Sequence, residues 1–194
     1  EDVELPDSFF DIIIGNVPFG QFKVSDKRYD KYKLLIHDYF FVKALDKIRP
    51  GGVIAFITSS GTMDKKNSSV RKYLAERAEL LGAIRLPNDT FQKNAGTKVT
   101  SDILFLQKKE CQTVEEPDWL YLAADSDGIS INQYFMEHPE MILGEMVMES
   151  SRFGGMESTC RSKDGVSLKS QLEEVIQRIH AEFVNFESEE LVEE

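Results

Sequence analysis

Four consecutive residues, Asn16-Val17-Pro18-Phe19, combine groups that could hold and activate a planar amine. The exocyclic nitrogen of a base, or a side-chain amide, is a poor nucleophile because its lone pair is delocalised into the neighbouring π system. The side-chain oxygen of Asn16 and the backbone carbonyl of Val17 can each accept one N–H and draw the nitrogen toward tetrahedral geometry. No proton need be removed before the nitrogen attacks. Pro18 stiffens the segment through its fixed φ, and Phe19 offers a face for stacking a base.

The apolar run that precedes this segment predicts how it is positioned. Residues 9–14 have the length and β-branched content of a buried parallel strand. That strand would end at Gly15-Asn16, so the four residues would lie at the carboxyl ends of strands, where open α/β sheets hold ligands. The sequence then predicts a helical apolar face over 40–48, which residues 49–52 end, and a strand over 53–57. A polar loop over 58–66, a helix over 70–81 and a strand over 83–87 are predicted to follow.

The motif and the order of these elements resemble a known family. Asn16-Val17-Pro18-Phe19 after an Asp-Ile-Ile-Ile-Gly strand is similar to the Asn-Pro-Pro-Tyr/Phe catalytic motif of amino-group methyltransferases, above all the adenine-N6 DNA methylases of the type I modification-subunit kind. Those enzymes also end their catalytic domain with Arg-Leu-Pro, a Gly-Thr pair with a later threonine, and a final apolar strand, here 85–87, 96–100 and 103–108. The resemblance covers about residues 1–110 and departs at Val17, where a proline usually stands.

The resemblance implies both a fold and a reaction. The fold is α/β: the second half of a Rossmann-like, S-adenosylmethionine-dependent methyltransferase sheet with an antiparallel final strand. The reaction is methyl transfer from S-adenosylmethionine to the N6 amino group of an adenine flipped out of DNA. Asn16, Val17, Pro18 and Phe19 would form the catalytic set, with Phe19 stacking on the base. Glutamine-amide and RNA-base amino methyltransferases share the motif, and a degenerate, non-catalytic scaffold or DNA-binding domain is a third alternative.

The resemblance also indicates what the chain needs from elsewhere. In this family the Gly-rich loop that cradles the cofactor, and the acidic residue that binds its ribose, precede the motif strand. Nothing before Phe9 matches them, so we expect a fragment that is inactive alone and has the N-terminal half of the domain as its partner. Glu1 is a candidate remnant of the acidic turn at the cofactor, with Asn16 as the second cofactor contact. The strand at 10–15 would expose an apolar edge in the fragment, which favours a homodimer.

Basic and aromatic residues alternate directly after the motif. Lys23, Lys27 and Arg28 lie near Phe22 and Tyr29. This combination suits contacts with the DNA strand that carries a flipped base. A solvated loop with ordinary charge alternation has the same pattern, so both interpretations stay open.

Further residues could contribute to the substrate side. Lys65, Lys66, Arg71 and Lys72, at the edge of the next loop and helix, could extend the basic face. Phe91, beside the polar stretch that follows the Arg-Leu-Pro strand, could pack on the base from the side opposite Phe19. These assignments depend on the tertiary arrangement.

Charge divides the chain into two regions. Residues 1–112 carry 18 Lys and Arg against 15 Asp and Glu, whereas residues 113–194 carry 5 against 19. Nonspecific DNA affinity comes mostly from phosphate neutralisation, so the acidic part argues against the fragment binding DNA tightly by itself. The resemblance implies that residues 1–112 are the catalytic half-domain, and we predict an acidic, α-rich extension over 113–194. The extension would contain a linker at 115–118, an Asn-capped segment at 129–138, a Met-rich arm at 141–156 and an amphipathic helix from Ser167.

Composition excludes several classes of protein. No apolar run approaches the ~20 residues of a membrane span and no leader is present, so we expect a cytoplasmic protein with no membrane partner. The two cysteines, Cys111 and Cys160, have no metal-type spacing, and His37, His138 and His180 occur singly. Neither a disulfide framework nor a metal site is predicted, and each histidine is expected at the surface or partly buried. The extension loosely resembles those of methylase-like proteins fused to helicase modules on mobile elements, which assigns it no chemistry.

Overall fold

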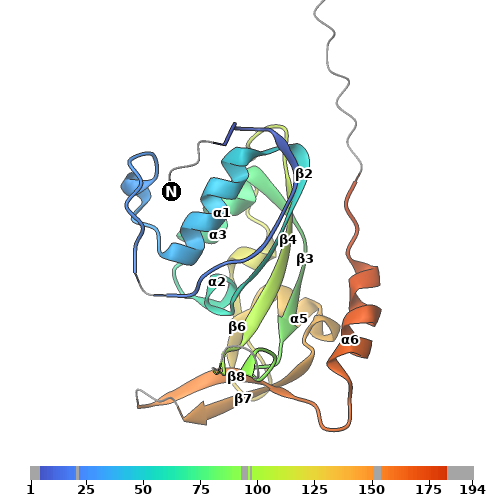
Figure 1. Cartoon of the computed structure of the whole chain (residues 1–194). Helices are drawn as coiled ribbons and strands as arrows, with labels where there is room; N and C mark the ends of the chain where they lie inside the picture. The colour runs from blue at the N-terminus through green and yellow to red at the C-terminus, as the bar shows by residue number, and fades with distance from the viewer. Residues whose placement is uncertain (1–4, 21, 93–95, 97, 151–153, 183–194) are drawn as a thin grey trace, which may run out of the picture.

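A four-stranded mixed sheet forms the centre of the computed structural model, which describes residues 5–20, 22–92, 96, 98–150 and 154–182 (Figure 1). The strand order is β1-β2-β4-β3. β1 pairs with β2 in parallel, and β4 is antiparallel to both of its neighbours, so the predicted antiparallel final strand is confirmed. The bounds are Phe10–Asn16 for β1, Ile48–Ser59 for β2, Ala78–Leu86 for β3 and Ser101–Lys108 for β4.

β2 begins five residues before the predicted strand. Ile48 pairs with Phe10, and the register then jumps so that Val53 pairs with Ile12, which leaves residues 49–52 as a bulge. Within the bulge Gly51 has a φ of 74°, a conformation that favours glycine. Helix α1 (Ile36–Lys47) thus ends just before residues 49–52, as predicted, and the chain passes directly from the helix into β2.

The predicted helix over 70–81 is wrong at its carboxyl end. Helix α3 spans Ser69–Arg77, and β3 begins at the next residue, Ala78, which pairs with Lys108 at the far end of β4. Helix propensity is a weak preference, and the hydrogen-bonding edge of the long neighbouring strand overrides it.

Helices lie on both faces of the sheet. α1 and α3 cover one face, whereas α5 (Gln133–Glu137) and α6 (Leu168–Val175) lie on the other (Figure 1). On the first face the rings of Phe41 and Phe56 pack edge to face with centroids 5.1 Å apart. On the second face Ile179 lies so close to Gly82 that an added Cβ would come within 3.0 Å of it.

The region after residue 112 is not α-rich, which corrects the prediction. In addition to α5 and α6 it contains two antiparallel strand pairs, β5 (Leu122–Ala124) with β6 (Ser130–Asn132) and β7 (Gly144–Ser150) with β8 (Met156–Ser162). The Met-rich stretch contains all of β7 and the first residue of β8, so the predicted arm forms a hairpin with the residues that follow it. Short 3-10 turns complete the fold: η1 (Asp30–Tyr32), η2 (Asp118–Leu120), η3 (Pro139–Met141) and η4 (Ile176–Arg178).

One hydrophobic core joins the two regions that charge distinguishes. Trp119, Leu120 and Phe135 are buried in the same cluster as the side chains of the central sheet. The predicted linker thus leads directly into a buried turn. The Asn cap is confirmed, because the Asn132 side chain accepts the backbone N–H of Tyr134 at 3.0 Å. The helix predicted from Ser167 is α6, which begins at Leu168 and ends at Val175.

Candidate functional site

Three strands end at one edge of the sheet, here named the carboxyl edge. β1, β2 and β3 run in the same direction because β4 is antiparallel to β2 and β3. Ser59 and Leu86 both pair with Ser101, and β1 ends beside β2 at Asn16. The segments that connect at this edge are 17–35, 60–68 and 87–100.

The four predicted catalytic residues lie together at the carboxyl edge. Asn16, Pro18 and Phe19 are exposed, with 37% of the Phe19 side chain open to solvent. Val17 is 4% exposed, packs in the main core, and donates its backbone N–H to the Ile57 carbonyl at 3.0 Å. Among the residues that the structure describes, nothing hydrogen-bonds the Asn16 side-chain amide. Its oxygen is therefore available to accept a hydrogen bond from a substrate.

The hydrogen bond of Val17 explains how the chain accommodates its departure from the usual motif. A proline has no N–H and could not bond the Ile57 carbonyl. The rigidity that proline would supply through its fixed φ comes here from a backbone hydrogen bond and a buried side chain. The position of Asn16 is thus set by attachment of the next residue to β2.

The basic segment after the motif does not stay at the carboxyl edge. Residues 22–35 run back along α1 (Figure 1). Arg28, predicted to contact substrate, lies 2.8 Å from Asp7 Oδ2 and 2.7 Å from Asp46 Oδ2 through its two terminal nitrogens. Asp46 belongs to the last turn of α1, beside the start of β1. The structure therefore does not bring Arg28 to Asn16.

The remaining predicted contacts lie in different environments. Lys23 forms an isolated bridge with Leu35, and both Lys23 and Lys27 are exposed on the same returning segment as Arg28. Phe91 is half-buried and packs against the main core from the segment between β3 and β4. Glu1 lies outside the described residues.

A buried polar cluster behind the motif was missed by sequence reasoning. His37 is 4% exposed and Asp38 2%, in the first turn of α1, so the prediction of a surface or partly buried His37 is wrong. Lys65 donates to Asp38 Oδ2 at 2.7 Å and so joins the segments that follow β1 and β2. Burial lowers the pKa of His37, with Asp38 opposing and Lys65 reinforcing this effect. The only signal of this cluster in the sequence was the pair His37-Asp38 at the start of an apolar helical face.

Arg71 is also unavailable to a DNA-facing surface. Its side chain is 1% exposed, and its guanidinium donates to the Leu120 carbonyl at 2.9 and 3.1 Å and to the Lys65 carbonyl at 2.9 Å. Arg71 therefore fixes the segment after β2 against the buried turn η2.

The Arg-Leu-Pro segment has a structural explanation. Arg85 is completely buried and lies between Asp102 of β4 and Asp64 of α2 (Gly61–Asp64), whose Oδ2 is 2.8 Å from Arg85 Nη1. Its guanidinium carbon is 4.2 Å from the ring centroid of Phe135. Burial alone would lower the pKa of Arg85, but the two carboxylates raise it above its ordinary value, so the side chain stays cationic. Arg85 thus holds α2 onto the sheet beneath the carboxyl edge.

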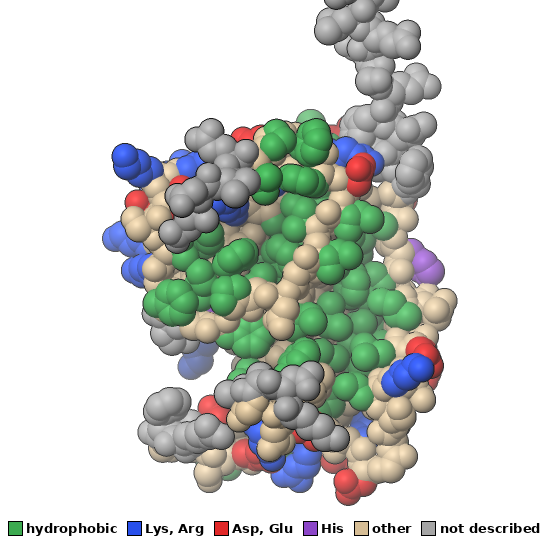
Figure 2. Space-filling view, in the orientation of Figure 1, with side chains coloured by type: hydrophobic (Ala, Val, Ile, Leu, Met, Phe, Trp, Pro, Cys, Tyr) green, Lys and Arg blue, Asp and Glu red, His purple; other side chains and the backbone are tan. Residues whose placement is uncertain are grey.

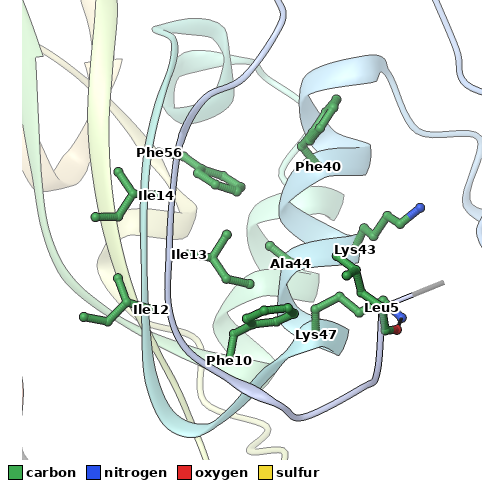
Figure 3. A pocket seen from close by; sticks show the side chains of 10 residues that line it. All are labelled: Leu5, Phe10, Ile12, Ile13, Ile14, Phe40, Lys43, Ala44, Lys47 and Phe56. Carbon is green, nitrogen blue, oxygen red and sulfur yellow. Dashed lines mark hydrogen bonds between the residues drawn. The ribbon is translucent and has the colours of Figure 1, made fainter. Parts of the chain in front are cut away.

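A cavity of about 430 Å³ lies between β1 and α1 (Figure 3). The Phe10 and Ile13 side chains point toward α1, whereas Ile12 and Ile14 point away from it. The lining is apolar apart from two lysines and offers no carboxylate to bind a ribose. Its residues are Leu5, Phe10, Ile12, Ile13, Ile14, Phe40, Lys43, Ala44, Lys47 and Phe56.

β1 exposes much of its apolar surface. Ile12 is 61% exposed, Ile14 76% and the preceding Phe9 64%, and hydrophobic side chains gather over the sheet in Figure 2. Within the described residues β1 has β2 as its single strand neighbour. An apolar strand on both faces is typical of the interior of a parallel sheet.

Two classes of site are absent from the described part of the chain. No group of three or more His, Cys, Asp and Glu residues there is arranged to hold a metal ion. None of the helices in the described ranges combines the length and apolar character required to cross a membrane.

Comparison with known proteins places these features in context. "Defense against restriction protein B" of Escherichia phage P1 is 36% identical over 118 residues, which is 59% of this chain and 5% of that protein. A Listeria monocytogenes protein assigned to the class I S-adenosylmethionine-dependent methyltransferases matches with a TM-score of 0.47 and 21% identity, over 59% of this chain and 36% of that one. A Vibrio vulnificus protein assigned as a type I restriction-enzyme modification subunit matches with a TM-score of 0.43 and 16% identity, over 84% of this chain and 40% of that one.

The family model described as N-6 DNA Methylase matches residues 1–180. This match includes the motif, the central sheet and most of the region after residue 112. The methyl donor of the family is S-adenosylmethionine. Since the match covers most of its length, the chain belongs to the N-6 DNA methylase family.

Proposed function

We propose that this chain supplies the amine-holding part of an adenine-N6 DNA methyltransferase site. The Asn16 side-chain oxygen and the Val17 carbonyl accept the two N–H groups of the target amine, and Phe19 stacks on the flipped base. The observation that carries the proposal is an exposed, unbonded Asn16 amide held at the carboxyl edge by the anchored Val17. Membership of the N-6 DNA methylase family supports the assignment.

The mechanism requires positioning rather than a general base. Accepting both N–H groups concentrates the nitrogen lone pair on the side away from the two acceptors. The buried Val17 keeps those acceptors fixed, so little rearrangement is needed when the nitrogen becomes tetrahedral. When bound, S-adenosylmethionine supplies an electrophilic methyl group. The proton of the methylated amine leaves after transfer.

We propose that the cofactor site is completed by residues other than those of the cavity beside β1. The cavity beside β1 has an apolar lining with Lys43 and Lys47, which suits neither the ribose nor the cationic sulfonium. Asn16 is the described candidate for a cofactor contact. We further propose that the open edge of β1 pairs with a cofactor-binding half of the sheet, which would also cover Ile12 and Ile14. The chain would then act within a longer protein.

The test is methyl transfer from labelled S-adenosylmethionine to unmethylated DNA by the full-length protein that contains this chain. Asn16→Ala should lower the rate by about 10²-fold or more, because it removes one preorganised group of the site. Asn16→Asp keeps an acceptor oxygen, so its methyl-transfer rate should fall less than that of Asn16→Ala. Gln177→Ala, a control at an exposed side-chain amide in η4, should leave the rate unchanged.

The outcomes separate the alternatives. Label on N6-methyladenine that disappears with Asn16→Ala supports the proposal. Label on glutamine side chains or RNA would change the substrate class. No transfer by a folded protein that binds S-adenosylmethionine would favour a non-catalytic scaffold.

A further inference from the structure

Another cavity lies beside the first half of α1. Its volume is about 330 Å³, and it opens between the segment 23–34 and Tyr39 of α1. It shares no lining residue with the apolar cavity between β1 and α1. Its lining combines two lysines, a serine and an aspartate with apolar and aromatic side chains. The lining residues are Lys23, Val24, Ser25, Tyr29, Asp30, Lys33, Leu34 and Tyr39.

An aromatic pair fixes the wall of this cavity. The rings of Tyr29 and Tyr39 meet edge to face with centroids 5.5 Å apart, and both residues are buried. Each hydroxyl is held by a carboxylate. Tyr29 donates to Asp46 Oδ2 at 2.7 Å, and Tyr39 donates to Asp26 Oδ2 at 2.8 Å. The shape of the cavity is therefore present before any ligand binds, which lowers the ordering cost of binding.

The cations of the lining lack a counter-charge within the protein. Lys23 and Lys33 are exposed, and neither forms an ion pair in the described part of the chain. Asp30 is the carboxylate of the lining, and its Oδ1 accepts the backbone N–H of Asp26 at 2.9 Å. Two ammonium groups against one carboxylate leave a net positive charge, so an anion is the ligand that complements the cavity.

Lys33 has a backbone conformation that lysine rarely adopts. Its φ is 53° and its ψ 38°, in the left-handed region, where it ends the turn η1. Glycine or asparagine is more usual at such a position. Lysine is less favourable there, and the described residues give its ammonium group no carboxylate partner. Both observations favour a ligand from outside the chain.

The cavity begins next to the Asn16 motif. Gly20 directly follows the motif, and an added Cβ on it would come to 2.5 Å from the Phe22 ring and 3.6 Å from Ile36. The Phe22 carbonyl accepts the Ile36 N–H at 3.0 Å, so Phe22 is held at the first residue of α1. Phe22 is 57% exposed and directly precedes Lys23. An exposed aromatic ring beside lysines is a combination that binds nucleic-acid strands.

We propose that this cavity binds a backbone phosphate of DNA, with Lys23 and Lys33 as its cations. The lysines complement the phosphate, and Val24 and Leu34 offer apolar surface to the adjoining deoxyribose. A sugar-phosphate backbone presents both kinds of surface, whereas a free inorganic anion has no apolar part. This inference rests on the proposed function for its partner, DNA. It adds a contact that holds the strand without reading its sequence.

Lysine footprinting of the full-length protein that contains this chain tests the proposal directly. Exposed lysines are acetylated briefly with and without a DNA duplex, and the modified positions are quantified by mass spectrometry. With duplex at about ten times its Kd, acetylation of Lys23 and Lys33 should slow about tenfold, because only the unbound fraction reacts. Lys169 of α6, on the other face of the sheet from α1, has a side chain that is 83% exposed (Figure 1). It is the control and should react equally in both samples.

A double variant measures the contribution of the cavity to affinity. Lys23→Gln combined with Lys33→Asn removes both cations, so the affinity for DNA should fall about tenfold near 0.1 M salt, because one phosphate fewer is neutralised. The slope of log affinity against log salt should decrease by about 1. Both effects should be equal for two duplexes of unrelated sequence. Lys169→Gln is the matched control and should change neither quantity.

Lys33→Asn alone separates binding from folding. Asparagine tolerates the left-handed backbone of position 33 better than lysine does, so the urea midpoint should stay equal or rise while the affinity for DNA falls. A lower midpoint together with weaker binding would indicate that Lys33 supports the fold, and would overturn its assignment as a phosphate contact.

The other outcomes separate this inference from the proposed function. Unprotected Lys23 and Lys33, or an unchanged salt slope in the double variant, would overturn the inference even in a protein that methylates DNA. Protection by deoxyadenosine monophosphate but not by DNA would also overturn it, since the cavity would then serve a free nucleotide. Protection by DNA in a protein that transfers no methyl group would contradict the proposed function and leave the phosphate site standing.

Discussion

Arg85 and Asp102 lie opposite each other in the β3–β4 ladder and form a two-pronged ion pair. Arg85 Nε and Nη2 donate to the two carboxylate oxygens of Asp102 at 2.9 Å each. Both side chains are completely buried. The arginine of the Arg-Leu-Pro segment therefore supports the carboxyl edge from inside and does not touch substrate.

Breaking this pair should destabilise the protein strongly. Asp102→Asn leaves a buried guanidinium without one of its counter-charges, so the free energy of unfolding should fall by about 3 kcal/mol. Urea denaturation followed by circular dichroism measures the change. Glu149→Gln, which breaks the exposed pair of Glu149 with Arg161, should cost less than about 1 kcal/mol. Equal losses in the two variants would contradict the assigned role of Asp102.

Val17→Pro should weaken the anchor of the motif, although it restores the residue usual in the family. The variant lacks the N–H that bonds the Ile57 carbonyl and should lower the free energy of unfolding by about 1 kcal/mol. Val17→Ile retains the N–H and serves as the control. Urea denaturation of the three proteins checks the prediction, and a Val17→Pro variant at least as stable as wild type would contradict it.

The exposed side chains of β1 should drive association of the 194-residue chain. Ile14→Lys places a charge on the apolar surface, so the chain should shift toward monomer in sedimentation velocity experiments. Val114 is 93% exposed on a different part of the chain. Val114→Lys is the control and should leave association unchanged. A monomeric wild-type chain at high concentration would show that this surface does not self-associate.

Stability should decrease on mild acidification because of His37. Its pKa is lowered in the folded protein from an ordinary value of 6.5, so below that pH the unfolded chain takes up a proton that the folded chain excludes. The free energy of unfolding should therefore fall as the pH drops from 7 toward 5. His37→Gln should reduce this slope, whereas His138→Gln, at an exposed position, should not. Denaturant titrations at several pH values measure it, and identical slopes in wild type and His37→Gln would contradict the prediction.

Local patterns were sufficient for most of the central unit. The apolar run before Asn16 predicted β1, and the Arg-Pro-Gly-Gly segment predicted the end of α1. The boundary at Ala78 was wrong because pairing with β4 is a long-range interaction that local propensity does not contain. The hairpin of the extension was missed for a different reason, since β7 and β8 contain little of the β-branched content that marks a strand.

By itself the sequence determined the family motif, the alternation of helices and strands, and the position of Asn16 after an apolar strand, because these depend on neighbouring residues. Tertiary structure alone decided which basic side chains are paired or buried within the protein. Arg28 pairs with Asp7 and Asp46, while Arg85 and Arg71 are buried. A charged side chain is placed by partners distant in sequence, since burying it requires compensating groups that only the folded chain brings together.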